Sequence, residues 1–140
     1  MKIREVMTSD VFTARPDASI FDLAELMRDE DIGAVPIVEE DKLVGMVTDR
    51  DIVIRGLADS QDPASATART VMTNTMLYCF DDQTVEEVLD NMGEQQVRRL
   101  PVVDRDKRLV GVVSIGDLCA AAPPERAGES LSQISQPTHH

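Results

Sequence analysis

Residues 43–51 read LVGMVTDRD, and residues 109–117 read LVGVVSIGD. Before these two stretches, Val6-Met7-Thr8 recurs as Val71-Met72-Thr73. The second copy has one extra residue near Arg108. Further matched pairs are Asp17 and Asp82, Met27 and Met92, Pro36 and Pro101, Val38 and Val103, and Lys42 and Lys107. So many ordered matches with a single insertion indicate an internal duplication.

Both copies predict the same element order: strand, helix, strand, strand, helix. The first helices begin at the capping boxes Ser19-x-x-Asp22 and Thr84-x-x-Glu87, and apolar residues follow at helical spacing. The predicted strands are Val35–Glu39, Leu43–Thr48, Leu100–Asp104 and Leu109–Ser114, and the second helices cover about Arg50–Leu57 and Gly116–Ala121. Neither half can bury its apolar faces alone. We therefore expect an α/β (α+β) fold of two β-α-β-β-α repeats packed with pseudo-twofold symmetry.

The predicted domain organisation follows the duplication. The first repeat covers 1–58, a linker covers 59–69 and the second repeat covers 70–122. The linker is rich in Asp, Ser, Gln, Pro and Ala, which suits an exposed connection. The remaining residues, 123–140, are rich in Pro, Ser, Gly and Gln and are expected to form a mobile tail.

Composition excludes several classes of function. The chain has 140 residues and a net charge of −12, which argues against nucleic acid or an anionic membrane as the main partner. No apolar run approaches the roughly 18 residues of a membrane helix, and no secretory signal is visible, so we expect a cytoplasmic protein. Cys79 and Cys119 form no Cys-x-x-Cys pair, and both histidines are the last two residues. No metal site and no enzyme motif are predicted.

On these residues the chain resembles a tandem pair of CBS domains, also called a Bateman module. The resemblance covers about Met1 to Ala122. Its motifs are Val6-Met7-Thr8, Pro36-Ile37-Val38 and residues 44–51 in the first copy, and Val71-Met72-Thr73, Leu100-Pro101-Val102-Val103 and residues 110–117 in the second. Residues 48–57, TDRDIVIRGL, are similar to stand-alone bacterial two-repeat proteins, including the hypoxic response type. The resemblance implies a non-catalytic regulatory module that binds AMP, or ATP or ADP, in clefts between the repeats and assembles as a homodimer, with no obligatory cofactor.

The same resemblance implies a set of site residues. Thr48 with Asp51, and Ser114 with Asp117, would bind the ribose, because a carboxylate can accept hydrogen bonds from both hydroxyls of a diol. The residues implied to contact phosphate are Arg98, Arg99 and Arg50. Those implied to line the base or the cleft wall are Thr13, Tyr78, Val35, Pro36, Leu100 and Pro101. By the family's crossed geometry, Thr13 would join Ser114 and Asp117, and Tyr78 would join Thr48 and Asp51.

Plainer interpretations stay open. Thr48-x-x-Asp51 is also a capping box, which needs no ligand. Arg98 and Arg99 can equally be surface cations paired with Glu94 or Asp104. The module can also serve protein interaction or dimerisation without a small ligand, and its protein partner is not identified by the sequence. If nucleotide binds, the two sites should differ, since Ile115-Gly116 replaces Asp49-Arg50 in the second copy.

Overall fold

The two long helices begin at the hydroxyls that the sequence predicts. In the computed structural model, which describes residues 1–74 and 77–135, Ser19 and Thr84 each accept a backbone hydrogen bond from the third residue after them, at 3.0 and 3.2 Å. Helices α1 (Ile20–Glu30) and α4 (Val85–Gln95) follow these caps. The carboxylates of the two predicted boxes form no return bond to the caps, so the hydroxyl alone caps each helix.

The first-repeat unit, Phe12–Met76, is built on an antiparallel hairpin. Its elements are α1, β1 (Ala34–Glu39), β2 (Lys42–Thr48), α2 (Asp49–Asp51), the π-helical segment η2 (Ile52–Leu57) and α3 (Ala68–Val71). The strand predicted before α1 is reduced to a single parallel bridge between Ala14 and Ile37. Val35, Ile37 and Val47 of the hairpin are fully buried against the helices of this unit.

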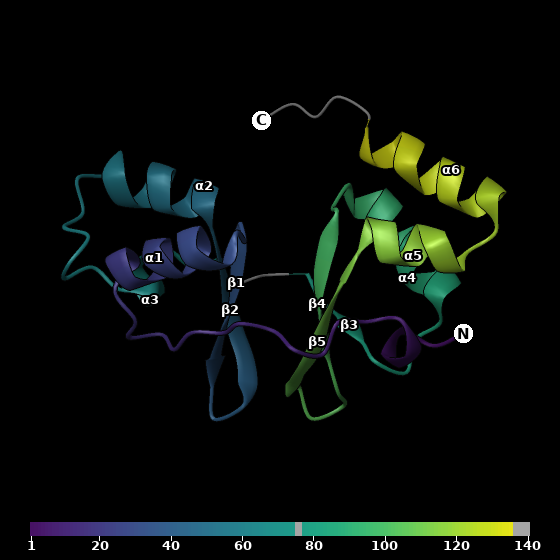
Figure 1. The fold of residues 1–140 in the computed structure, drawn as a ribbon, viewed down its shortest axis with the longest axis horizontal. Coiled ribbons are helices and arrows are strands. Elements are labelled where there is room, and N and C mark those ends of the chain that lie inside the picture. The colour runs from purple at the N-terminus through teal and green to yellow at the C-terminus, as the bar shows by residue number, and fades with distance from the viewer. Residues whose placement is uncertain (75–76, 136–140) are drawn as a thin grey trace. The chain divides into compact units, whose positions relative to one another are not determined.

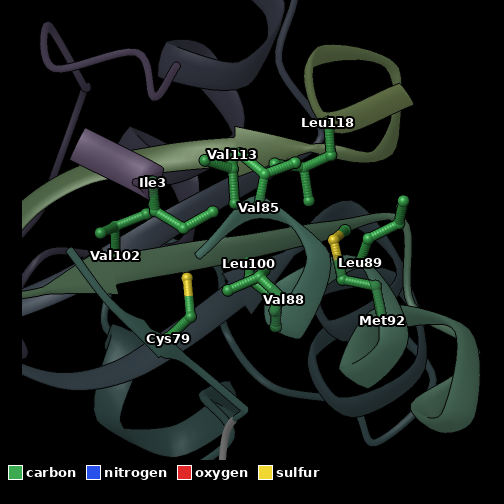
Figure 2. Packing of buried hydrophobic residues seen from close by; sticks show 10 residues of the cluster. All are labelled: Ile3, Cys79, Val85, Val88, Leu89, Met92, Leu100, Val102, Val113 and Leu118. Carbon is green, nitrogen blue, oxygen red and sulfur yellow. The ribbon is translucent and has the colours of Figure 1, made fainter. Parts of the chain in front are cut away.

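The second-repeat unit contains Met1–Val11 together with the chain from Leu77. Its elements are η1 (Ile3–Glu5), β3 (Cys79–Phe80), α4, β4 (Arg99–Val103), β5 (Leu109–Ser114), α5 (Ile115–Ala121) and α6 (Pro124–Ile134). The sheet order is β3-β4-β5, with β3 parallel to β4 and β4 antiparallel to β5 (Figure 1). Helices α4 and α5 contribute Leu89, Met92 and Leu118 to its core, where they meet side chains of the strands (Figure 2).

The leading segment of each repeat packs on the hairpin of the other repeat. Ile3 is fully buried in the core of the second-repeat unit, and Thr8 and Val112 exchange two backbone hydrogen bonds of 2.9 Å. Met46 and Thr73 make the equivalent pair in the first-repeat unit, at 3.0 and 3.2 Å. The compact units therefore differ from the predicted domains 1–58 and 70–122, because residues 1–11 belong to the second-repeat unit.

The glycine of the repeated Leu-Val-Gly stretch lets the leading segment of one repeat pack on the hairpin of the other. A Cβ on Gly111 would lie 2.6 Å from Met7 Sδ, and one on Gly45 would lie 2.5 Å from Met72 Sδ. Both distances are shorter than a van der Waals contact. At Gly111 a Cβ would also lie 2.8 Å from the backbone oxygen of Thr8, so a side chain there would push the crossing segment away, whereas at Gly45 the Met72 side chain would have to move. The repeated glycine thus marks the place where the segment crosses each hairpin.

Helix α6 corrects the prediction of a mobile tail. Residues Pro124–Ile134 form a helix that packs on α4 and α5, while residues 136–140, including both histidines, lie outside the described residues. Arg126 Nη2 donates to Asp90 Oδ2 at 2.6 Å, and Ser130 is 2% exposed. The composition suggested disorder because the helix has few large apolar residues. Its small residues instead let it approach α4 closely.

Candidate functional site

The β4–β5 pairing places basic residues beside the start of α5. Arg99 lies directly opposite Ser114 in the ladder, and Arg98 O accepts a hydrogen bond from Ile115 N at 2.8 Å. Both arginine side chains are exposed. The second-repeat unit thus brings Arg98 and Arg99 together with Ser114 and Asp117, four of the predicted ligand-binding residues.

Ser114 and Asp117 form a reciprocal capping box. Ser114 Oγ accepts from Asp117 N, and Asp117 Oδ2 accepts from Ser114 N, each at 3.2 Å. The capping interpretation of this motif is therefore confirmed. The cap uses Oδ2, and Oδ1 of the exposed Asp117 has no hydrogen-bond partner among the described residues. One carboxylate oxygen remains free to accept a hydrogen bond from a ligand.

Alternation along the strands sorts the remaining residues between the two faces of the sheet. Cys79, Leu100 and Val113 belong to the core cluster (Figure 2), so their strand neighbours point to the opposite face. That opposite face carries Tyr78, Arg99, Pro101 and Ser114. The pairing of Cys79 with Val102 brings Tyr78 alongside Pro101. We call these four residues, with Arg98 and Asp117, the second-repeat ligand face.

Val35 and Leu100 are core residues of the two units. They are 0% and 5% exposed and lie in the two hydrophobic cores. Pro36 and Pro101 are also buried, so the assignment of these four residues to the base or cleft wall stays a prediction. Val35 and Leu100 each immediately precede a predicted site residue, Pro36 or Pro101, and successive side chains of a strand point to opposite faces.

The first-repeat unit has the same cap and strand pairing but different side chains beside the cap. Thr48 and Asp51 form the same reciprocal cap, at 3.1 and 2.9 Å, and Ala34 lies opposite Thr48 where Arg99 lies opposite Ser114. Thr13 precedes the Ala14 bridge and lies alongside Pro36, in the place that Tyr78 has in the other unit. The exposed Arg50 is the cation nearest this cap in sequence. The crossed grouping, in which Thr13 joins Ser114 and Asp117 while Tyr78 joins Thr48 and Asp51, stays a prediction.

No ion pair to Arg98 or Arg99 is found within the described ranges 1–74 and 77–135. Asp104, one of the partners considered for them, accepts from Arg108 Nε at 3.1 Å instead. Hydrogen bonds from the backbone of Arg108 and Asp106, together with the Arg108 charge, lower the pKa of Asp104. The two guanidinium groups are thus available to an anionic ligand.

Sequence reasoning missed the surroundings of Tyr78. Its ring meets the Phe80 ring edge-on at 5.7 Å, and Lys107 Nζ lies 5.2 Å from the centre of the Tyr78 ring. Arg105 covers the Phe80 ring at 4.0 Å. The available signal was the inserted residue near Arg108, which lengthens the turn that carries these cations.

Cys79 is buried and Cys119 is partly buried, and both are free thiols. Burial raises the pKa of the Cys79 thiol to about 12 and also raises the pKa of Cys119. Cys79 is 2% exposed and lies in the core of the second-repeat unit. No group of three or more His, Cys, Asp or Glu side chains suited to a metal ion is found among the described residues. No helix among them is long and apolar enough to cross a membrane.

Comparison with known proteins identifies the repeated unit. The CBS domain family model matches residues 3–57 and again residues 68–123. The chain belongs to the CBS domain family. CBS pairs are typically regulatory, non-catalytic modules, and no catalytic family is shown for this chain. The CBS-pair fold expected from the sequence is confirmed, and helix α6 lies beyond the second match.

Related CBS proteins cover almost the whole chain. Hypoxic response protein 1 of Mycobacterium tuberculosis is 38% identical over 96% of this chain and 94% of its own length. A crystal structure of hypoxic response protein I with two coordinated zinc ions has a TM-score of 0.78 at 40% identity, covering 88% of this chain and 100% of that chain. The resemblance to the hypoxic response type is thereby confirmed.

Two further CBS structures contain adenosyl ligands. CBSX2 in complex with AMP has a TM-score of 0.74 at 26% identity, covering 86% of this chain and 94% of that one. The CBS domain pair of protein MJ0100, in complex with 5′-methylthioadenosine and S-adenosyl-L-methionine, has a TM-score of 0.74 at 29% identity over 86% and 94%.

Proposed function

We propose that this CBS pair is a regulatory module that binds an adenine nucleotide, with AMP as the preferred ligand. The observation that carries the proposal is the pairing of Arg99 with Ser114 on the second-repeat ligand face. It combines two guanidinium groups that have no ion pair among the described residues with a carboxylate oxygen for a ribose hydroxyl. CBS pairs that bind AMP, 5′-methylthioadenosine or S-adenosylmethionine provide the class of ligand.

Charge favours the monophosphate among these ligands. Arg98 and Arg99 can form forked hydrogen bonds to phosphate oxygens, which 5′-methylthioadenosine and S-adenosylmethionine lack. The chain carries a net charge of −12, so each additional phosphate of ADP or ATP adds repulsion from the protein as a whole. Two neighbouring cations match the charge of one terminal phosphate.

Calorimetric titration with AMP, ADP, ATP and 5′-methylthioadenosine tests the proposal. AMP should bind and raise the melting temperature, because it binds only the folded state. Asp117→Asn keeps one oxygen for the Ser114 cap and replaces the free oxygen with an amide donor, so AMP affinity should fall about tenfold or more. Asp51→Asn makes the same change on the first-repeat cap and reports whether that site contributes.

Two results would contradict different parts of the proposal. If AMP produces neither heat nor a melting shift with the wild type, nucleotide binding fails. If the wild type binds but Asp51→Asn and Asp117→Asn both bind equally well, the ribose assignment fails while nucleotide binding stands.

A protein-interaction role is the second candidate, and an apolar surface favours it. Phe21 of α1 is 54% exposed, and Val53, Ile54 and Leu57 of η2 are 52%, 48% and 61% exposed. Such clusters on neighbouring helices are typical of contacts between protein chains, and a second copy of this chain is the simplest partner. If light scattering finds only single chains at high protein concentration, the homodimer hypothesis is refuted.

A further inference from the structure

The turn between β4 and β5 covers the aromatic rings of β3. Arg105 Cζ lies 4.0 Å from the centre of the Phe80 ring, and Lys107 Nζ lies 5.2 Å from the centre of the Tyr78 ring. The two rings contact each other edge to face, with planes at 83°. We call Tyr78, Phe80, Arg105 and Lys107 the aromatic clamp.

Hydrogen bonds fix the turn that carries the clamp cations. Asp104 Oδ1 accepts from the backbone N–H groups of Asp106 and Arg108, at 2.9 and 3.0 Å, and Lys107 N donates to Asp104 O at 3.0 Å. Lys107 adopts a left-handed backbone conformation, with φ of 64°, in a position where the chain reverses. The turn is therefore a defined structure that holds Lys107 near Tyr78.

An ion pair anchors the other cation of the clamp. Arg105 donates to both carboxylate oxygens of Asp82, at 2.7 and 2.9 Å, and this bond lowers the pKa of Asp82. Asp82 follows β3 by two residues, so the forked pair ties the end of β3 to the turn. Because β3 has only two paired residues, the clamp supplies side-chain contacts that its short ladder lacks.

The first repeat has no counterpart of the clamp. Thr13 and Arg15 occupy the positions that correspond to Tyr78 and Phe80, and its hairpin turn is one residue shorter. That turn uses Glu40 and Asp41, both with positive φ, and Lys42 begins β2 directly. The insertion near Arg108 and the two aromatic residues therefore occur together, in the repeat that also carries Arg98 and Arg99.

We propose that Lys107 is a positioning residue that holds the Tyr78 ring for packing against the adenine base of a bound nucleotide. This inference rests on the proposed function. The ring lies on the same face as Arg99 and Ser114, and it is already restrained by Lys107 and Phe80 before a ligand arrives. Restraining a side chain in advance reduces the entropy lost on binding. Lys107 acts through Tyr78 and does not contact the phosphate.

Calorimetric titration of AMP into Lys107 variants tests the role. Lys107→Met keeps a long apolar chain but removes the charge, and AMP affinity should fall about two- to fivefold, the size of an exposed cation–π interaction. Lys107→Arg should restore affinity, because a guanidinium also binds an aromatic face. Lys42→Met is the matched control, since Lys42 is the repeat-equivalent lysine and has no aromatic ring near it among the described residues.

The salt dependence of AMP binding separates positioning from direct phosphate contact. In Lys107→Met, raising the sodium chloride concentration should weaken AMP binding by the same factor as in the wild type. In Arg99→Met that factor should shrink, because a screened charge pair has been removed. A reduced salt dependence in Lys107→Met, unchanged AMP affinity, or failure of Lys107→Arg to restore it would each overturn the inference.

Tyrosine fluorescence tests the clamp without any ligand. Tyr78 is the single tyrosine of a chain that has no tryptophan, so the emission reports this ring alone. Lys107→Met should increase quenching by acrylamide and Lys42→Met should not. Unchanged quenching in Lys107→Met would refute the clamp, whereas failure of the wild type to bind AMP would refute the proposed function whatever the fluorescence shows.

Discussion

Replacing Ile3 with alanine should destabilise the second-repeat unit, although Ile3 belongs to the first repeat in sequence. Its side chain is fully buried in the core of the second-repeat unit, with Cys79, Val85 and Val102 among the residues of that cluster (Figure 2). The substitution removes three carbon atoms, worth about 0.8 kcal/mol each in transfer free energy, and leaves a cavity. We expect a loss of about 2–5 kcal/mol of unfolding free energy, the usual range for truncating a buried isoleucine to alanine.

Hydrogen exchange under native conditions shows where this loss falls. In Ile3→Ala, amides of α4 and β5 should exchange faster than in the wild type, while those of α1 should change less. Val71→Ala is the matched control, because Val71 belongs to the second repeat in sequence but is fully buried in the first-repeat core. It should have the opposite pattern. If Ile3→Ala deprotects α1 more than α4, the exchanged arrangement of the leading segments is refuted.

Two further predictions concern α6 and the buried thiol. Gly93→Arg places on α4 the residue that α1 has at the equivalent position, Arg28. The new Cβ would overlap Gln133 Oε1 and lie 3.2 Å from Ser130 Cα, so residues 124–134 should lose protection from hydrogen exchange. Gly128→Ala is the control, because its Cβ meets no atom within 4 Å and protection should be kept. Burial raises the pKa of Cys79 from about 9 in the unfolded chain to about 12, so the stability that the buried neutral thiol contributes is fully present below pH 9 and is lost as pH rises toward 12. The unfolding free energy should therefore fall over that range, and it should fall less steeply in Cys79→Ala. Equal slopes would contradict the assignment.

The elements within each repeat were predictable because local signals determine them. Ser19 and Thr84 cap their helices, and the predicted strand Leu109–Ser114 is the observed β5. Alternation and helical spacing are properties of neighbouring residues, so a single sequence reveals them. The predicted helix over Arg50–Leu57 also forms, as α2 followed by a π-helical segment, although its π geometry has no comparable local signal.

The exchange of leading segments was not predictable from the same signals. Val6-Met7-Thr8 and Val71-Met72-Thr73 are equally compatible with either hairpin, because Gly45 and Gly111 are equivalent residues. Which hairpin each segment packs on is determined by the whole core, in which Ile3 contacts residues far away in the sequence. Helix α6 escaped prediction for a related reason. Its stability depends on Gly93 of α4 and on the Arg126–Asp90 pair, neither of which the tail sequence contains.

The candidate site was only partly predictable, since a strand position alone does not tell which face a residue occupies. The capping boxes of Thr48 and Ser114 were identified correctly, but Val35 and Leu100 proved to be core residues. The face is decided by which residues of the strand join the core cluster. Once that is known, Tyr78, Arg99 and Ser114 fall on one side.

The divergence between the two copies is concentrated in one unit. Gly33-Ala34 corresponds to Arg98-Arg99, Thr13 to Tyr78, and the shorter hairpin turn to the turn that carries Lys107. A duplication that served only to build a symmetric fold would have no reason to change the exposed face of one copy while retaining the cap, the proline and the glycine of both. The retained residues are those that the fold requires: the caps begin the helices and the glycines let the leading segments cross. The changed residues carry charge or an aromatic ring, and all lie where a ligand could reach them in the second-repeat unit. We therefore expect the shared caps and glycines to serve the fold, with Asp51 and Asp117 also offering the proposed ribose contact, and the differing residues to make the two copies bind ligand differently.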